Sequence, residues 1–276
     1  MDPREFERTA IRILESARAE GRLTENPDDA QLVTILAREP RIQRTIYGNY
    51  VADSEPTSRS AIFTKNSVDD VFGEEEARLL AQCEELLSNQ RLISVDRIVG
   101  SRNSNTSVRL IVPERFAHVA YGGRNLFYAP LSPVTTPNYH IVFFYDDAFD
   151  RNRDLPLAQK DITIRLAMLE DGKVVKIVRN GNYIGEYKKG VFAAEDWTQK
   201  TYGQGLFLHA GCREDHLQSA HGDYRTVRTL LVALSANGKT STTCKILARK
   251  GNEKSWLIQD DGGTLHPDGS FHGFEG

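Results

Sequence analysis

The chain has 276 residues, of which 39% are hydrophobic and 26% are charged, and its formal net charge at pH 7 is −3. A chain of this length can bury one large core or two small ones, and its composition excludes disordered and collagen-like proteins. Acidic and basic residues are spread along the whole chain. Since no block of Lys and Arg marks a nucleic-acid footprint, we expect no nucleic-acid partner.

The compartment is predicted from the cysteines and the apolar runs. Cys83, Cys212 and Cys244 lie far apart and form no CxxC pair, which indicates neither a disulfide framework nor a thiolate zinc site. The first residues are charged where a secretory signal needs an apolar run, and the longest apolar runs have only the length of a strand. We therefore expect a cytoplasmic protein with no membrane partner.

Residues 1–45 carry helix signals. Asp2 and Pro3 are typical of a helix start, and apolar residues recur at helical spacing as far as Gly21. A second start signal at residues 26–29 precedes another apolar periodic stretch. The sequence predicts a helical N-terminal segment, for which packing or partner contact is the default role.

Residues 46–225 show a mixed pattern. Apolar residues on one face predict a helix over 75–87. Apolar β-rich runs predict strands, which cover residues 92–99, 108–112, 139–145, 162–168 and 174–178. Asp171-Gly172 between the last two strands is typical of a two-residue hairpin turn. An α/β lobe with a mixed sheet follows from this pattern.

Residues 226–276 carry the pattern with the clearest chemistry. A continuous apolar run at 227–234 predicts a fully buried strand, Gly238-Lys239-Thr240 follows it, and a helix is expected over 239–248. In a phosphate loop, backbone N–H groups surround phosphate oxygens, the lysine bridges the outer phosphates and the hydroxyl binds Mg²⁺. The chain thus has a strand, a loop and a helix in the order that a nucleotide site needs.

Two features decide how this loop is interpreted. Ala233 replaces the first glycine of GxxxxGK[ST], so the loop by itself could be a chance Gly-Lys-Thr between a strand and a helix. A second predicted strand, 256–259, ends in Asp260-Asp261, and two carboxylates at the end of a buried strand are costly unless they face a cation. Together the two elements predict binding of a nucleoside triphosphate with a divalent metal.

Several segments resemble the ATP-dependent phosphoenolpyruvate carboxykinase family, and they occur in the order of that family. They are Thr57-Ser58-Arg59-Ser60, residues 124–130, residues 183–190, Leu208-His209-Ala210, residues 234–240, residues 257–261 and residues 268–276. The resemblance implies an α/β phosphoenolpyruvate-carboxykinase-like fold, with a mixed-sheet substrate lobe at 46–225 and the beginning of a P-loop-like nucleotide lobe at 226–276. It also implies the reaction of oxaloacetate with ATP to give phosphoenolpyruvate, CO₂ and ADP, with Mn²⁺ and with Mg²⁺ bound to ATP.

The resemblance also implies the metal and substrate residues. Lys189, His209 and Asp261 match the ligands of the transition metal, usually Mn²⁺. A lysine binds a metal only as the neutral amine, so its pKa must fall through burial and nearby cations. Lys188 matches a lysine that contacts the transferred phosphoryl group. Arg59 matches an arginine that holds the substrate carboxylate.

The remaining implied roles concern the substrate and the nucleotide. Tyr183 matches a tyrosine that lies against oxaloacetate or phosphoenolpyruvate. Thr240 would bind Mg²⁺, and Asp260 would support the water shell of that ion. The nucleotide-binding residues implied by the loop are Ser235, Ala236, Asn237, Gly238, Lys239, Thr240 and Ser241.

Each residue also has a simpler interpretation. A pair such as Lys188-Lys189 most often lies on a solvated face, and a lone histidine such as His209 is more often a core residue than a ligand. Arg59 could be an ordinary loop arginine, and Tyr183 could only pack. Without the family order, these simpler interpretations are the more common ones.

The sequence also departs from the family pattern. Gln259 and Ser58 replace glycines, and the family continues well beyond the position of Gly276. We therefore expect a fragment or a shortened relative that shows no carboxykinase turnover by itself. The alternative functions are a kinase of another substrate on the same scaffold and a non-catalytic nucleotide-binding or interaction module.

Overall fold

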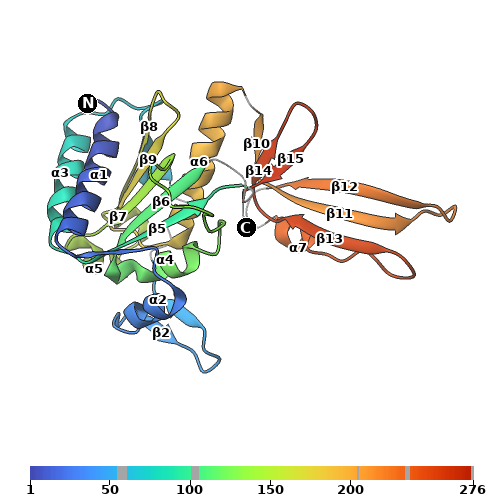
Figure 1. The fold of residues 1–276 in the computed structure, drawn as a ribbon, viewed down its shortest axis with the longest axis horizontal. Coiled ribbons are helices and arrows are strands. Elements are labelled where there is room, and N and C mark those ends of the chain that lie inside the picture. The colour runs from blue at the N-terminus through green and yellow to red at the C-terminus, as the bar shows by residue number, and fades with distance from the viewer. Residues whose placement is uncertain (55–60, 101–105, 204, 234–236, 275–276) are drawn as a thin grey trace. The chain divides into compact units, whose positions relative to one another are not determined.

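A computed structural model of the chain describes residues 1–54, 61–100, 106–203, 205–233 and 237–274 (Figure 1). These residues form two compact units, Met1–Ala194 and Glu195–Gly276, and the boundary falls within helix α6 (Ile184–Tyr202). Helices and a large mixed sheet make the fold α/β, as predicted. The assignment of residues 46–225 and 226–276 to a substrate lobe and a nucleotide lobe stays a prediction. In the described part of the chain, no helix is long and apolar enough to cross a membrane.

The first unit is built on a seven-stranded sheet with the order β1-β5-β6-β7-β9-β8-β4. The strands are β1 (Leu23–Glu25), β4 (Thr64–Asn66), β5 (Leu92–Ile98), β6 (Ser107–Pro113), β7 (Tyr139–Phe144), β8 (Thr163–Met168) and β9 (Val174–Arg179). Strands β5–β6 and β8–β9 pair antiparallel, and the other neighbours pair parallel. The five longer strands lie where the apolar runs predicted them. The β8–β9 hairpin turns at Gly172, whose φ of +83° favours glycine.

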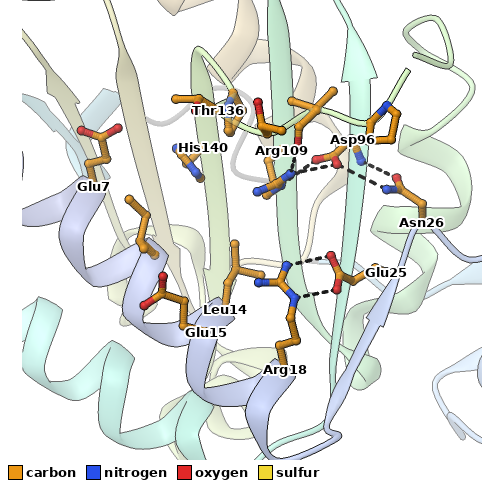
Figure 2. Close-up of a pocket in the computed structure, with 15 residues that line it drawn as sticks. Glu7, Leu14, Glu15, Arg18, Glu25, Asn26, Asp96, Arg109, Thr136 and His140 are labelled. Carbon is orange, nitrogen blue, oxygen red and sulfur yellow. Dashed lines mark hydrogen bonds and ion pairs between the residues drawn. The ribbon is translucent and has the colours of Figure 1, made fainter. Parts of the chain in front are cut away.

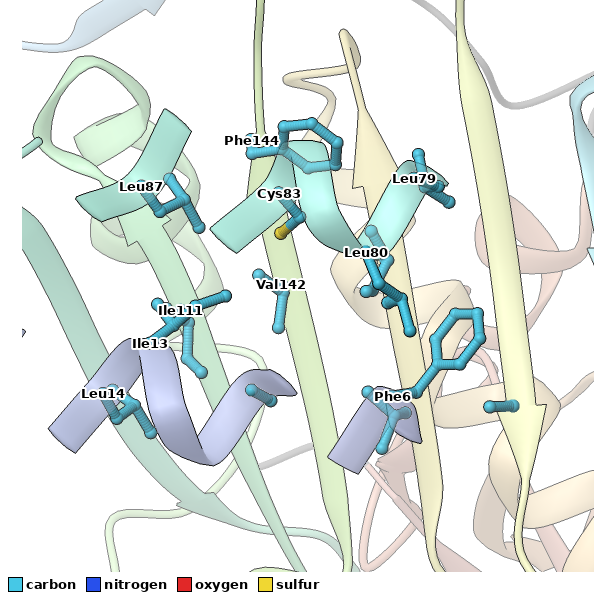
Figure 3. Packing of buried hydrophobic residues seen from close by; sticks show 14 of the residues in the cluster. Phe6, Ile13, Leu14, Leu79, Leu80, Cys83, Leu87, Ile111, Val142 and Phe144 are labelled. Carbon is cyan, nitrogen blue, oxygen red and sulfur yellow. The ribbon is translucent and has the colours of Figure 1, made fainter. Parts of the chain in front are cut away.

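Two helices, α1 (Arg4–Ala19) and α3 (Glu74–Ser88), cover one face of this sheet (Figure 1). Their apolar faces pack on alternate residues of the central strands, as Figure 3 shows for Cys83 of α3 beside Val142 and Phe144 of β7. Side chains that alternate along a strand point to the same face. The core of the first unit therefore lies between these two helices and the sheet.

Helix α6 begins on the opposite face. Its Gly190 lies so close to β7 that an added Cβ would be 2.7 Å from Ile141 Cδ1. Glu186 of the same helix forms a buried ion pair with Lys176 of β9, at 2.6 Å. The absent side chain at Gly190 thus allows the helix to lie directly on the sheet, and the ion pair compensates the two buried charges.

Shorter elements complete the first unit. They are α2 (Asp29–Leu36), β2 (Ile42–Arg44), β3 (Tyr50–Ala52), η1 (Ala61–Phe63), η2 (Glu114–Phe116), α4 (Ala117–Gly123), α5 (Ala148–Arg151), η3 (Asn152–Asp154) and η4 (Leu157–Gln159). A capping box in which Asp28 and Gln31 exchange hydrogen bonds starts α2. The helical prediction for residues 1–45 holds for α1 and α2, but the same segment also supplies β1 and β2.

The second unit contains two three-stranded sheets. One has the order β12-β11-β13 and the other β10-β14-β15. Their strands are β10 (Leu206–Leu208), β11 (Ala210–Gln218), β12 (Tyr224–Val232), β13 (Lys254–Gln259), β14 (Gly263–Leu265) and β15 (Phe271–Gly273). The prediction of a fully buried strand at 227–234 is wrong, because Val227 of β12 is 51% exposed and Val232 is 63% exposed. Strand β12 lies at the edge of its sheet, and α7 (Lys239–Thr243), which contacts it, has only five residues.

Helix α7 is shorter than the predicted helix over 239–248. Its sequence is rich in Ser and Thr, which have low helix propensity. Arg213 of β11 donates hydrogen bonds to the carbonyl oxygens of Thr242 at 3.0 Å and of Thr243 at 3.3 Å. A basic side chain that binds the last carbonyls stabilises a helix end, which explains why α7 ends at Thr243.

Candidate functional site

One end of the β12-β11-β13 sheet gathers the chemically interesting residues of the second unit. Strand β11 is antiparallel to both neighbours, so β12 and β13 run in the same direction and end at the edge where β11 begins. His209 directly precedes β11, the phosphate loop follows β12, and Asp260-Asp261 follows β13. The sheet topology therefore brings together three segments that are far apart in the sequence.

The carboxylate of Asp261 is the centre of this arrangement. His209 Nε2 lies 2.7 Å from Asp261 Oδ1, although 52 residues separate the two in the sequence. Lys239 Nζ donates to the same oxygen and, at 2.9 Å, to the backbone carbonyl of Asp261. The side chain of Lys239 is only 5% exposed, while that of His209 is 34% exposed. A buried ammonium group, a carboxylate and a more accessible imidazole thus meet at one oxygen.

A second contact at the same edge joins Thr240 to Asp260. The Thr240 hydroxyl donates to Asp260 Oδ2 at 3.0 Å. The other oxygen, Asp260 Oδ1, is buried and has no hydrogen-bond partner among the described residues. A buried carboxylate oxygen without a partner is costly, and Mg²⁺ takes such oxygens as ligands together with water and phosphate. The donor set therefore fits a Mg²⁺ ion bound with a nucleotide.

The described side chains do not by themselves form a complete metal site. In the part of the chain that the structure describes, no three His, Cys, Asp or Glu side chains gather into a group able to hold a metal ion. The imidazole of His209 and the carboxylate of Asp261 supply two ligands of the types that Mn²⁺ and other transition metals accept. A metal at this place needs a third protein ligand or ligands from substrate and water.

The phosphate loop is described from Asn237 onward, whereas Ser235 and Ala236 lie outside the described residues. Gly238 adopts the left-handed conformation, with φ +76°, immediately before α7. Asn237, Gly238, Thr240 and Ser241 are exposed at this helix start. Free N–H groups and an accessible hydroxyl at a helix start favour an anion.

Arg213 and Asp215 support the end of α7, although neither was among the residues predicted for the site. Their side chains are buried and form a bidentate ion pair at 2.6 and 2.7 Å. The hydrogen bonds from Arg213 hold the pKa of Asp215 below its ordinary value. Gly211 on the same strand leaves room for the Thr243 side chain. The Arg-x-Asp alternation on one strand face was the available sequence signal.

Gln259, which replaces a family glycine, is accommodated by another glycine. Its side chain is buried against Gly273 of β15, where an added Cβ would lie 2.6 Å from Gln259 Oε1. The substitution therefore fills space beside Gly273 and leaves the following Asp260 in contact with Thr240.

The other predicted site residues belong to the first unit or lie outside the description. On α6, Lys188 Nζ is 5.4 Å from the Phe192 ring centroid and Lys189 Nζ is 5.8 Å from the Tyr183 ring centroid. Burial lowers the pKa of Lys189, although the nearby Glu186 opposes this shift. Arg59 lies outside the described residues. That Lys189 joins His209 and Asp261 stays a prediction.

The comparison with known families agrees with the resemblance. A family model described as phosphoenolpyruvate carboxykinase matches residues 19–276. A search of curated proteins found no significant match to the chain. Since the family match covers most of the sequence, the chain belongs to the phosphoenolpyruvate carboxykinase family.

Proposed function

We propose that the chain binds ATP with Mg²⁺, together with a Mn²⁺ ion, for the reaction of oxaloacetate and ATP to phosphoenolpyruvate, CO₂ and ADP. The observation that carries this proposal is the convergence of Lys239 and His209 on one carboxylate oxygen of Asp261, beside the Thr240–Asp260 contact. Family membership supports the reaction type.

The nucleotide end of the site uses Lys239 and its neighbours. Lys239 would neutralise the outer phosphates, since it is the first residue of α7 and its ammonium group is held at the end of β13 by Asp261. Thr240 Oγ1 and Asp260 Oδ1 would hold Mg²⁺ or its water shell. The exposed Asn237 and Ser241 complete the loop that we assign to ATP.

The substrate end of the site is assigned to His209 and Asp261. His209 and Asp261, with Lys189, are the ligands that we assign to Mn²⁺. A divalent cation there would supply electrostatic stabilisation of negative charge on substrate oxygens. Lys188 is assigned to the transferred phosphoryl group, and Arg59 and Tyr183 to the substrate carboxylate. The protein would then accelerate the reaction mainly by positioning the reactants and by electrostatic stabilisation of the transition state.

Electron paramagnetic resonance of Mn²⁺ tests the metal assignment without requiring turnover. We expect the chain to bind Mn²⁺, His209→Gln to weaken this binding at least tenfold, and oxalate to change the spectrum of bound Mn²⁺. His216→Gln is the matched control, because His216 lies on β11 and binds Thr226 away from the site. Equal Mn²⁺ affinity in the His209 variant and the control would refute the metal assignment. ATP binding without any effect of oxalate would favour a kinase of another substrate.

A further inference from the structure

A separate cavity of about 430 Å³ lies in the first unit, between α1 and residues 133–137 (Figure 2). This volume is in the range of sites for small molecules. Its lining comes from α1, β1, β5, β6 and β7, and it includes none of the residues assigned to ATP, metal or substrate. The cavity therefore needs an explanation of its own.

Most charges around the cavity are already neutralised in pairs. Arg109 and Asp96 form a bidentate pair at 2.6 and 2.9 Å. Arg18 and Glu25 form another, with both distances 2.8 Å. Glu7 is paired with Lys173 at 2.7 Å. Because these charges already have partners, the polar groups that can still form hydrogen bonds should determine which ligand the cavity prefers.

The sheet side of the cavity has such capacity for a negatively charged group. His140 is 2% exposed, and its Nδ1 is buried with no hydrogen-bond partner in the described ranges of the chain. Arg109 uses Nε and Nη2 for Asp96 and the Val134 carbonyl, whereas no described residue accepts from its Nη1. Burial, Arg109 and Lys173 lower the pKa of His140 to about 3, so the imidazole is neutral and lies in a positive field.

The helix side has the opposite character. Figure 2 shows Leu14 and Glu15 of α1 facing His140 and Arg109 across the cavity. Glu15 is exposed, and within the described residues its carboxylate has no ion pair or side-chain hydrogen bond, although its charge acts on the nearby Arg18. Ile11 and Leu14 supply an apolar wall. The cavity thus has a positive end, a negative rim and an apolar wall.

We propose that this cavity binds a small zwitterion, namely an α-amino acid with an apolar side chain. Its carboxylate lies toward Arg109 Nη1 and His140, its ammonium group toward Glu15, and its side chain against Ile11 and Leu14. A charge-assisted hydrogen bond at each end gives selectivity over molecules that carry only one of the two charges. This site is independent of the proposed carboxykinase function.

Calorimetric titration of the 276-residue chain with three probes tests the ligand class. The probes are L-leucine, 3-methylbutylamine, which lacks the carboxylate, and 4-methylpentanoate, which lacks the ammonium group. We expect L-leucine to bind with a Kd of about 1 mM or tighter, and each analogue to bind at least tenfold more weakly, which is about 1.4 kcal/mol. The absence of saturable L-leucine binding, or equal binding of either analogue, would overturn the proposal.

Two substitutions locate the binding. Glu15→Gln should weaken L-leucine at least tenfold and leave 4-methylpentanoate unchanged, because only the former carries an ammonium group. Ile11→Trp, at a wall position that is 40% exposed, should fill the cavity and abolish binding. The control is Glu85→Gln on α3, which removes the same charge from an exposed residue outside the lining. L-leucine affinity that is unchanged by Glu15→Gln, or equally reduced by the control, contradicts the site.

Discussion

Lys239 donates a hydrogen bond to the backbone carbonyl of Asp261 at 2.9 Å and a second one to the carboxylate of the same residue. The phosphate-loop lysine is thereby fixed to the end of β13. Because the lysine side chain is 5% exposed, its charge depends on this carboxylate for compensation. The loop after β12 and the acidic end of β13 therefore act as one site.

Replacement of this lysine tests the nucleotide assignment. Lys239→Ala should abolish detectable ATP binding in calorimetry, because the outer phosphates lose their cation. Lys245→Ala, which removes an exposed lysine shortly after α7, should keep the affinity of the unchanged chain. Far-UV circular dichroism checks that both variants are folded. ATP affinity that survives Lys239→Ala would remove the phosphate loop from the proposal.

The buried pair Arg213–Asp215 should be essential for the second unit. Arg213→Ala leaves Asp215 buried without its partner and releases the end of α7, so we expect a loss of about 3 kcal/mol in the free energy of unfolding. Arg228→Ala on β12 removes a largely exposed pair with Glu214 and should cost about 1 kcal/mol or less.

Intrinsic tryptophan fluorescence during urea unfolding measures this difference, because both tryptophans, Trp197 and Trp256, belong to the second unit. Replacement of both members of the pair, in Arg213→Met with Asp215→Leu, should cost less than Arg213→Ala, since no buried charge remains unpaired. Equal losses for Arg213→Ala and Arg228→Ala would show that the pair contributes no more than a surface contact.

The helices and strands could be predicted from the sequence where the spacing of apolar residues determines the structure. The apolar alternation of the central strands and the one-sided face of α3 predict their positions closely. The helix over 239–248 and the buried strand over 227–234 were wrong for tertiary reasons. Arg213 binds the end of α7 from a neighbouring strand, and β12 lies at the edge of its sheet, where the α7 that contacts it has only five residues.

The site was predictable only in part. The contact between His209 and Asp261 depends on the antiparallel order around β11, which no local pattern of the sequence encodes, so it could be expected only from the family resemblance. The cavity beside α1 was not predicted at all. Its polar members, such as Glu15, Arg109 and His140, come from elements that meet only in the folded sheet.

His140 should make the first unit sensitive to acid. Burial, Arg109 and Lys173 lower its pKa to about 3 from the ordinary value of 6.5. Below pH 6.5 the unfolded chain binds a proton at this histidine and the folded chain does not, so stability falls as the pH falls toward 3. The largest slope from one such group is about 1.4 kcal/mol per pH unit.

The measurement compares the slopes of stability against pH, because His140→Gln also changes packing. Far-UV circular dichroism gives the unfolding free energy between about pH 4 and 6, where the folded and unfolded states differ by roughly one proton at His140. As the pH falls, this free energy should decrease less steeply in His140→Gln than in the unchanged chain. His221→Gln, at an exposed turn residue, should keep the original slope. Identical slopes for His140→Gln and the unchanged chain would mean that His140 is protonated in the folded protein.

The contact between Gln259 and Gly273 predicts a dependence of one residue on the other. In Gly273→Ala, the new methyl group would lie 2.6 Å from Gln259 Oε1, and Gln259 is buried, so its side chain must move. Overpacking of this kind costs about 1–3 kcal/mol. Gln259→Gly removes the obstructing side chain, so Gly273→Ala should cost much less in that background. Urea unfolding followed by tryptophan fluorescence gives both costs, and their difference is the coupling energy of the double-mutant cycle.

The displaced Gln259 directly precedes Asp260, so Gly273→Ala should also weaken ATP binding in the presence of Mg²⁺. The double variant should recover the ATP affinity. An equal cost of Gly273→Ala in both backgrounds would show that Gln259 does not determine the need for glycine at position 273.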